Sequence, residues 1–330
     1  MSRLPLTLAC WSYDRTRALF DGRARPDGID LTCLDLPVEE TFFRMLRHRE
    51  FEIAEMSLSS YVMSLFADDP PFVAIPVFLS RFFRHSCIYV NAAAGIERPD
   101  DLIGRTVGTP EYQMTAPVWI RGILADAHGV PVESVGYVTG GLEEPGRSEK
   151  LPLDLPPSIR VRHIGPDRTL SAMLATGEID ALYTARAPSS FRARDGRVRR
   201  LFADFQAVER AYFRRTRIFP IMHTVVIRRD IYKEHRWIAQ SLHKAFAAAQ
   251  RDAYEDLTHT AALKTMLPWL TAYVEETRRE MGEDFWPYGL APNVDALATF
   301  LRYSHEQGLS RRRLSPDELF APETLESFKI

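Results

Sequence analysis

The sequence predicts an α/β protein with two lobes, each built on a mixed, mostly parallel sheet flanked by helices. Short apolar segments alternate with helical patterns through the first two thirds of the chain, and such alternation is typical of βαβ units. The chain has 330 residues, of which 45% are hydrophobic and 26% are charged. This length and composition provide a large core that can divide into two domains.

Charge and composition also limit the partners. The formal net charge is −2 at pH 7 and no basic block occurs, which argues against a nucleic-acid or anionic-membrane surface. The first twenty residues lack the apolar region of a signal peptide, and no apolar run is long enough to span a membrane. Three cysteines in apolar contexts are typical of reduced thiols. We therefore expect a cytoplasmic protein that binds small molecules, with homo-oligomer formation left open.

The first lobe begins with three strand and helix pairs. Strands are expected at LTLACWS, IDLTCLDL and FEIAEMS, and helices over residues 15–22, 39–49 and 59–67. FVAIPVFLS and HSCIYVN predict further strands, followed by a crossover near residues 92–95.

The second lobe shows its own alternation. Strands are expected over residues 106–109 and at VGYVTG, RVRHIG and DALYTAR, with helices over residues 115–128 and at TLSAMLATGEI. The Pro- and Gly-rich excursion over residues 140–157 is too long for a tight connection, and such loops are usually functional or mobile. FPIMHTVVIRRDIY predicts the strand that returns to the first lobe. Helices are then expected over residues 237–257, 261–267, 273–281 and 294–306.

These elements place residues 1–93 and 222–330 in the first lobe and residues 94–221 in the second. One lobe from both chain ends and one from the middle, joined by two crossovers, is the organisation of the type II periplasmic-binding-protein fold. Ligands of open α/β sheets bind beyond the carboxyl ends of the strands. We therefore expect a ligand cleft between the lobes.

The corner before the 115–128 helix is unusually polar. It carries Glu111, Tyr112, Gln113 and Thr115 within one short turn. The first free N–H groups of the helix would form an anion site that a carboxylate could occupy. The alternative is that Thr115 only caps the helix and Tyr112 only packs.

Other strand ends bring cationic, imidazole and hydroxyl side chains to the same edges. Arg81, Arg84 and His85, in the first half of SRFFRHSCIYVN, suit an acidic ligand, although a solvated strand end would look the same. His223 lies at the return crossover, where an isolated histidine is more often a core residue. Further candidates for ligand binding are Arg186, Ser12, Tyr13, Ser57 and Ser59, the last also a candidate helix cap.

The sequence lacks the motifs of several common kinds of catalytic and cofactor site. The sequence has no G-x-S-x-G, no G-x-G-x-x-G, no P-loop and no metal-ligand spacing. We therefore expect chemistry that needs no cofactor.

Three segments resemble the 4,5-dihydroxyphthalate decarboxylase family, cytoplasmic enzymes on the type II binding-protein fold. They are RFFRHSCIYVN, PDDLIGRTVGTPEYQMTAPVWIRGILADAHGV and GGLEEPGR. The resemblance extends over nearly the whole chain and is weakest in the C-terminal third, where FWPYG matches best. It implies non-oxidative decarboxylation of a hydroxylated aromatic dicarboxylate, with 4,5-dihydroxyphthalate giving protocatechuate and carbon dioxide.

The resemblance also implies roles. Each carboxylate of that substrate lies para to a hydroxyl, so a protonated ring carbon is stabilised by the para oxygen and carbon dioxide can leave without an organic cofactor. His85 or His223 would be the acid, and Glu111 or the other histidine the base. Arg81, Arg84 and the corner amides would hold the carboxylates. A divalent metal that bridges the catechol oxygens stays open. The competing class is a non-catalytic solute-binding protein for an aromatic or sulfonated anion.

Overall fold

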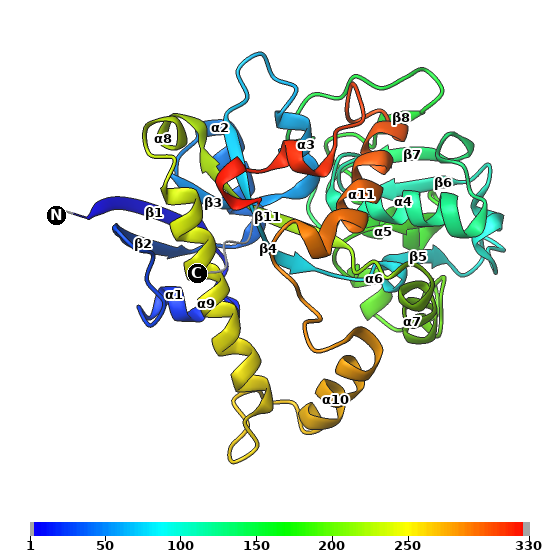
Figure 1. Ribbon diagram of the computed structural model, residues 1–330. Coiled ribbons are helices and arrows are strands. Elements are labelled where there is room, and N and C mark those ends of the chain that lie inside the picture. The colour runs from blue at the N-terminus through cyan, green and yellow to red at the C-terminus, as the bar shows by residue number, and fades with distance from the viewer. Residues whose placement is uncertain (1–2, 326–330) are drawn as a thin grey trace. The chain divides into compact units, whose positions relative to one another are not determined.

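The computed structural model describes residues 3–325, which form two compact units (Figure 1). The first unit contains the chain up to Arg81, residues 221–297 and the chain from Leu314. The second contains residues 82–220 and 298–313.

The first unit is built on a five-stranded sheet in the order β2-β1-β3-β11-β4. Strands β1 and β2 and strands β1 and β3 pair in parallel, whereas β11 is antiparallel to β3 and β4. The carboxyl ends of β1, β3 and β4 and the beginning of β11 therefore lie at one edge. The strands are β1 (Leu4–Cys10), β2 (Ile29–Asp35), β3 (Ile53–Ser57), β4 (Phe72–Arg81) and β11 (Ile221–Arg228).

The core of this unit lies between its sheet and helix α9 (Ile238–Thr258). Ile238, Leu242, Phe246 and Ala249 recur on one face of α9 and are fully buried against the strands, as expected of an amphipathic helix. The other helices are α1 (Arg17–Phe20), α2 (Val38–His48), α3 (Leu58–Ser64), α8 (Arg229–Glu234) and α10 (Leu270–Met281). Helix α10 and the end of α9 extend away from the sheet (Figure 1).

The second unit is built on a six-stranded sheet in the order β10-β5-β9-β6-β7-β8. Strands β9, β6, β7 and β8 are parallel, and β5 is antiparallel to β9 and β10. The strands are β5 (Ile88–Asn91), β6 (Thr106–Thr109), β7 (Gly136–Thr139), β8 (Val161–His163), β9 (Ala181–Tyr183) and β10 (Val198–Arg200).

Helices cover this sheet, and α11 (Val294–Glu306) enters the unit from residue 298 onward. Helix α4 approaches α11 so closely that a Cβ on Gly122 would lie 2.2 Å from the ring of Tyr303. Only glycine fits at that position. The other helices are α4 (Thr115–His128), α5 (Leu170–Thr176), α6 (Ser189–Arg192) and α7 (Phe205–Thr216).

The predicted helices over residues 115–128 and 294–306 have the bounds of α4 and α11. Residues 261–267 are not helical, because their exposed side chains give a helix no face to bury. Helix α7 escaped prediction because Tyr212 and Phe213 are its only buried residues.

The units differ from the predicted lobes at two places. Strand β5 pairs with β9 and β10, so the chain enters the second unit at residue 82 rather than near residues 92–95. Residues 298–313 also belong to the second unit, because Tyr303 packs on α4.

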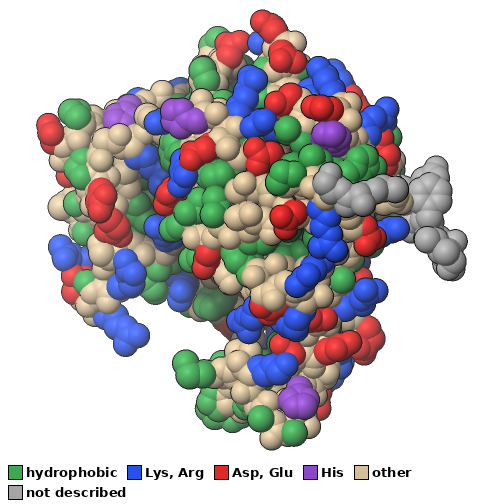
Figure 2. Space-filling view, turned by 90° about the vertical axis from the view of Figure 1, so that its left-hand side faces the viewer, with side chains coloured by type: hydrophobic (Ala, Val, Ile, Leu, Met, Phe, Trp, Pro, Cys, Tyr) green, Lys and Arg blue, Asp and Glu red, His purple; other side chains and the backbone are tan. Residues whose placement is uncertain are grey.

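The surface is mixed in charge. Acidic and basic side chains are interspersed over the face in Figure 2, as the small net charge predicts. Large hydrophobic side chains are exposed around α10, namely Leu263, Met266, Leu267, Trp269 and Tyr273. Among the described residues, no helix combines the length and apolar character needed to span a membrane.

Candidate active site

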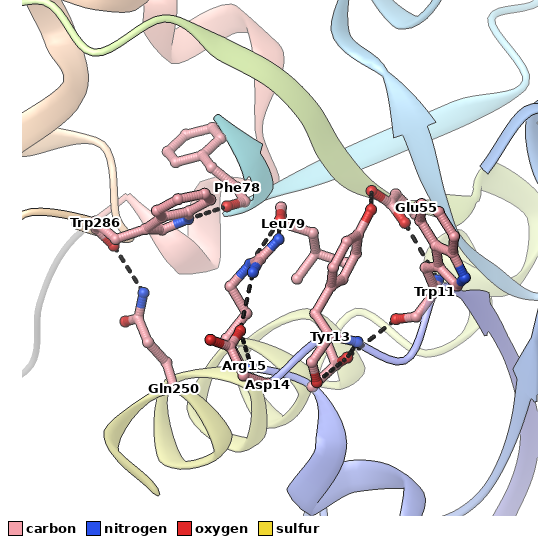
Figure 3. Close-up of polar contacts among 10 residues, drawn as sticks. Trp11, Tyr13, Asp14, Arg15, Glu55, Phe78, Leu79, Gln250 and Trp286 are labelled. Carbon is pink, nitrogen blue, oxygen red and sulfur yellow. Dashed lines mark hydrogen bonds and ion pairs between the residues drawn. The ribbon is translucent and has the colours of Figure 1, made fainter. Parts of the chain in front are cut away.

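A buried carboxylate lies near the strand-end edge of the first sheet. Glu55 of β3 is 0% exposed, and its Oε1 accepts hydrogen bonds from the Tyr13 hydroxyl at 2.8 Å and His223 Nδ1 at 2.7 Å. Its Oε2 accepts from the backbone N–H of Trp11 at 3.4 Å. Figure 3 shows the side chain of Tyr13 pointing at Glu55 from the loop after β1. Three segments distant in sequence therefore meet at one carboxylate.

This arrangement fixes the orientation of the imidazole. A carboxylate only accepts hydrogen bonds, so Nδ1 of His223 carries the hydrogen and Nε2 is the nitrogen left for a ligand. The ring of Phe42 contacts the imidazole edge-on at 4.9 Å between centroids. Burial, and then Glu55, raises the pKa of Tyr13, so its phenol stays protonated and donates. The His223 side chain remains 16% exposed, which suits proton exchange with a ligand.

Arg15 holds Tyr13 in place from the other side. Its guanidinium lies between the rings of Tyr13 and Trp286, 4.0 and 4.5 Å from their centroids (Figure 3). It donates to the Leu79 carbonyl at 2.7 Å and pairs with Asp14 at 2.9 Å. Arg15 is thus committed to packing and hydrogen bonds within the unit.

The other predicted residues of this unit lie at the same edge with different surroundings. Arg81 is 5% exposed, burial lowers its pKa to about 10, and it donates to the Pro287 carbonyl and to Asn293. Through these contacts Arg81 anchors the segment that follows α10, which is a structural role.

The predicted serines divide by exposure. Ser12 is exposed and its N–H donates to Asp35, whereas Ser57 is buried opposite His223 in the sheet register. Ser59 is fully buried inside α3. The expected cap by Ser59 is wrong, because the helix already begins at Leu58.

The second sheet gathers the remaining candidates at the carboxyl ends of β6, β7 and β9. The polar corner follows β6, Arg186 follows β9, and His85 precedes the antiparallel β5. His85 therefore lies with the polar corner and Arg186 at an edge of the second sheet, and not in the first lobe, where residues 1–93 were expected.

The 140–157 excursion folds over the corner. Glu111 is 0% exposed, and its Oε1 accepts from Arg147 Nε at 2.9 Å and from Lys150. The Gln113 side chain donates to the carbonyl of Leu151 at 3.0 Å. Ion pairs of Glu111 with Arg147 and Lys150 therefore hold the excursion against the corner.

The same excursion supplies a carboxylate to the corner amides. Glu149 accepts from the backbone N–H groups of Tyr112 at 2.6 Å and Gln113 at 3.4 Å. The chain's own carboxylate thus occupies the amides of Tyr112 and Gln113, which precede the first helical residue, Thr115. The anion site expected at the first free N–H groups of the helix stays a prediction. Thr115 is the first residue of α4, and Met114 holds the N-cap position. The alternative that Thr115 is the N-cap residue is therefore wrong.

His85 is enclosed by aromatic rings. It is 2% exposed, with ring centroids of Phe202 and Tyr212 at 5.6 and 5.3 Å. Burial, reinforced by His128 and Arg215, lowers the pKa of His85 to about 4. Its imidazole is therefore neutral at pH 7 and has no acidic proton to give.

The two arginines of this edge differ. Arg84 is buried with its guanidinium 4.7 Å from the ring centroid of Phe82, and Arg186 is exposed. Among the described residues, no group of three or more His, Cys, Asp or Glu side chains is arranged to hold a metal ion.

Sequence reasoning missed Glu55 and the charged residues of the excursion. The available signal for Glu55 was an acid between Ala54 and Met56 in the middle of the expected strand FEIAEMS, because a buried carboxylate needs partners. Arg147, Glu149 and Lys150 lie in the charged run GRSEK, which looks like a solvated loop.

The fold has close counterparts among solved structures. The periplasmic sulfonate-binding protein of Methylobacillus flagellatus aligns over 98% of this chain and 93% of its own, with a TM-score of 0.56 and 14% identity. The aliphatic sulphonate-binding protein of Escherichia coli aligns over 98% and 99%, with a TM-score of 0.52 and 14% identity. At this identity the likeness shows the fold alone, and it confirms the predicted type II periplasmic-binding-protein-like fold. The ligand cleft between the lobes stays a prediction.

The chain is thus an α/β protein of the solute-binding-protein fold that carries a buried carboxylate and imidazole pair. No protein-family model matches the sequence. The 4,5-dihydroxyphthalate decarboxylase of Comamonas testosteroni is 44% identical over 330 residues, 100% of both chains. That of Pseudomonas putida is 44% identical over 214 residues, 65% of this chain and 83% of the relative. The chain belongs to the 4,5-dihydroxyphthalate decarboxylase family.

Proposed function

We propose that the protein decarboxylates 4,5-dihydroxyphthalate without oxidation, giving protocatechuate and carbon dioxide. The observation that carries this conclusion is 44% identity over the full chain to a decarboxylase of that substrate. The protein is a carboxy-lyase. The competing class is non-catalytic solute binding; the sulfonate-binding proteins named above are 14% identical to this chain, and that likeness shows the fold alone.

We assign the proton delivery to His223. Glu55 holds Nδ1 at 2.7 Å, so an imidazolium would present its Nε2–H to a ligand. His85 suits this task less well, because its pKa of about 4 keeps it neutral at pH 7. The negative charge of Glu55 stabilises the imidazolium until its proton is transferred.

The step balances without a further reactant. Nε2 of His223 donates its proton to the ring carbon that bears the departing carboxylate, and the oxygen para to that carbon stabilises the positive charge. The bond between ring carbon and carboxylate then breaks, its electron pair restores the aromatic ring, and carbon dioxide leaves. His223 regains a proton from solvent.

The other roles rest on weaker support. Glu111 as the base for the phenol proton stays a prediction, and its Oε1 would first have to leave Arg147 and Lys150. A role in phthalate catabolism, a cytoplasmic location and homo-oligomer formation also stay predictions.

The deciding experiment incubates the purified protein with 4,5-dihydroxyphthalate and measures carbon dioxide and protocatechuate, which should form in equal amounts. Phthalate is the matched control substrate, because it has no para oxygen and should bind without reacting. His223→Asn should still bind both acids but should lower kcat by about 10²-fold or more, as expected for lost proton transfer. Demonstrated binding of the dihydroxy acid without release of carbon dioxide would overturn the function.

A further inference from the structure

The backbone N–H groups of Tyr112 and Gln113 form a two-donor site that the side chain of Glu149 occupies. The distances are 2.6 Å from Tyr112 N to Oε1 and 3.4 Å from Gln113 N to Oε2. Each carboxylate oxygen thus accepts one N–H group. Any carboxylate of a ligand could accept the same two hydrogen bonds in the same planar arrangement.

Both peptide groups are polarised toward an anion. The carbonyl of Tyr112, which shares a peptide group with the Gln113 N–H, accepts from Arg121 at 2.6 Å. The carbonyl of Glu111, which shares a peptide group with the Tyr112 N–H, accepts from the Thr109 hydroxyl at 3.1 Å. A donor on the carbonyl strengthens the N–H of the same peptide group.

A buried cation adds to this polarity. Arg121 is 1% exposed and donates to the side chain of Gln307 and to the Tyr112 carbonyl, both neutral groups. Within the described part of the chain its third nitrogen is buried without a hydrogen-bond partner. This uncompensated charge favours an anion at the neighbouring amides.

The surroundings of Glu149 disfavour its charged form. Glu149 lies beside Glu111, and burial, with a further contribution from Glu111, raises the pKa of Glu149. Arg147 and Lys150, which flank Glu149 in sequence, both bind Glu111. The segment that delivers Glu149 to the amides therefore also delivers two cations to the same corner.

We propose that Glu149 is an internal stand-in for a substrate carboxylate, which a dicarboxylate ligand displaces from the Tyr112 and Gln113 amides. The proposal rests on the proposed function, since the displacing ligand is taken to be the dicarboxylate substrate. When Glu149 leaves, the ligand takes over both N–H groups beside Arg147 and Lys150. Glu149 then competes with the substrate, and its occupancy sets the apparent affinity.

The test compares Glu149→Ala and Glu149→Gln with wild type in calorimetric titrations with phthalate. Both variants remove the carboxylate that competes for the amide pair, so phthalate should bind about tenfold more tightly. KM for the dihydroxy acid should also fall, whereas kcat should stay within about threefold of wild type. Glu143→Gln is the matched control, because Glu143 lies on the same excursion but accepts hydrogen bonds from Ser189. It should leave the affinity unchanged.

Unchanged or weaker phthalate binding in the Glu149 variants would overturn the proposal and make Glu149 a structural tie. The glutamine variant keeps the side-chain size, so it decides the question if the alanine variant fails to fold. Phthalate binding needs no turnover. If the protein never releases carbon dioxide but the Glu149 variants still bind phthalate more tightly, the proposed function is wrong and the amide site is supported.

Discussion

Replacement of Glu55 by glutamine removes one charge from the first unit and leaves the shape of the side chain nearly unchanged. The carboxylate is fully buried and accepts from Tyr13, His223 and the Trp11 N–H. An amide has one acceptor oxygen. If that oxygen keeps the bonds to Tyr13 and His223, the amide nitrogen faces the N–H of Trp11 and two donors oppose each other.

The size of the effect follows from these contacts. His223 loses the anion that orients and stabilises its imidazolium, and general acid catalysis contributes about 10²- to 10⁴-fold. We therefore expect kcat to fall by at least about 10²-fold, or about 3 kcal/mol at 1.36 kcal/mol per factor of ten. KM and phthalate affinity should stay close to wild type, because Glu55 is buried behind Tyr13 and His223.

Steady-state formation of protocatechuate measures kcat and KM, and titration with phthalate measures binding. Glu52→Gln is the matched control, since Glu52 lies beside the other end of β3 and accepts the N–H of Thr7 at 2.9 Å. Both variants lose a carboxylate that accepts a backbone N–H, from Thr7 of β1 for Glu52 and from Trp11 just after β1 for Glu55, but of the two only Glu55 bonds to His223. A kcat within about threefold of wild type in Glu55→Gln would refute the role of the Glu55 and His223 pair.

Two further predictions concern stability. Tyr13→Phe removes one hydrogen bond to the buried charge of Glu55 while the ring keeps its contact with Arg15, so the free energy of unfolding should fall by about 1.5 to 3 kcal/mol; a denaturant titration that shows less than about 0.5 kcal/mol would contradict this. His85 has its pKa lowered from 6.5 to about 4, so its contribution is complete above pH 6.5 and is lost as pH falls toward 4, because the unfolded chain takes up the proton first. The loss should reach about 3 kcal/mol, and His85→Phe should flatten this pH dependence; equal acid sensitivity in wild type and variant would contradict it.

The sequence carried enough to predict most strands of both sheets, because alternation of strand and helix patterns depends on local residues, but it did not predict the short β10. Helix α4 was correct to the residue because its apolar face and the glycine that follows lie within one segment. The path of β5 was not predicted, since HSCIYVN is equally apolar whichever sheet it joins. Pairing with β9 decides this, and the register of distant strands is a tertiary property.

Contacts between distant segments also limited prediction of the candidate site. Tyr13 and His223 could be singled out at strand ends, but Glu55 joins them across 42 and 168 positions of sequence. Residue types predict that a buried acid needs donors, not which donors it finds. At the corner an anion at the helix N–H groups was predicted, but the contact of Glu149 with the preceding amides of Tyr112 and Gln113 was not, because Glu149 arrives through a loop whose path the sequence leaves undetermined.

The two buried carboxylates then differ in the partners that surround them, and this difference separates their roles. Glu111 is bound by Arg147 and Lys150, so a proton on it would break two ion pairs. Glu55 is bound by a phenol, a backbone N–H and an imidazole. The proposed transfer of a proton from His223 to a ligand would change the charge balance around Glu55. A buried carboxylate without a permanent cationic partner lowers the stability of the fold. For Glu55 this cost has a use under the proposed function, because the partner is then the His223 imidazolium that delivers a proton to the substrate.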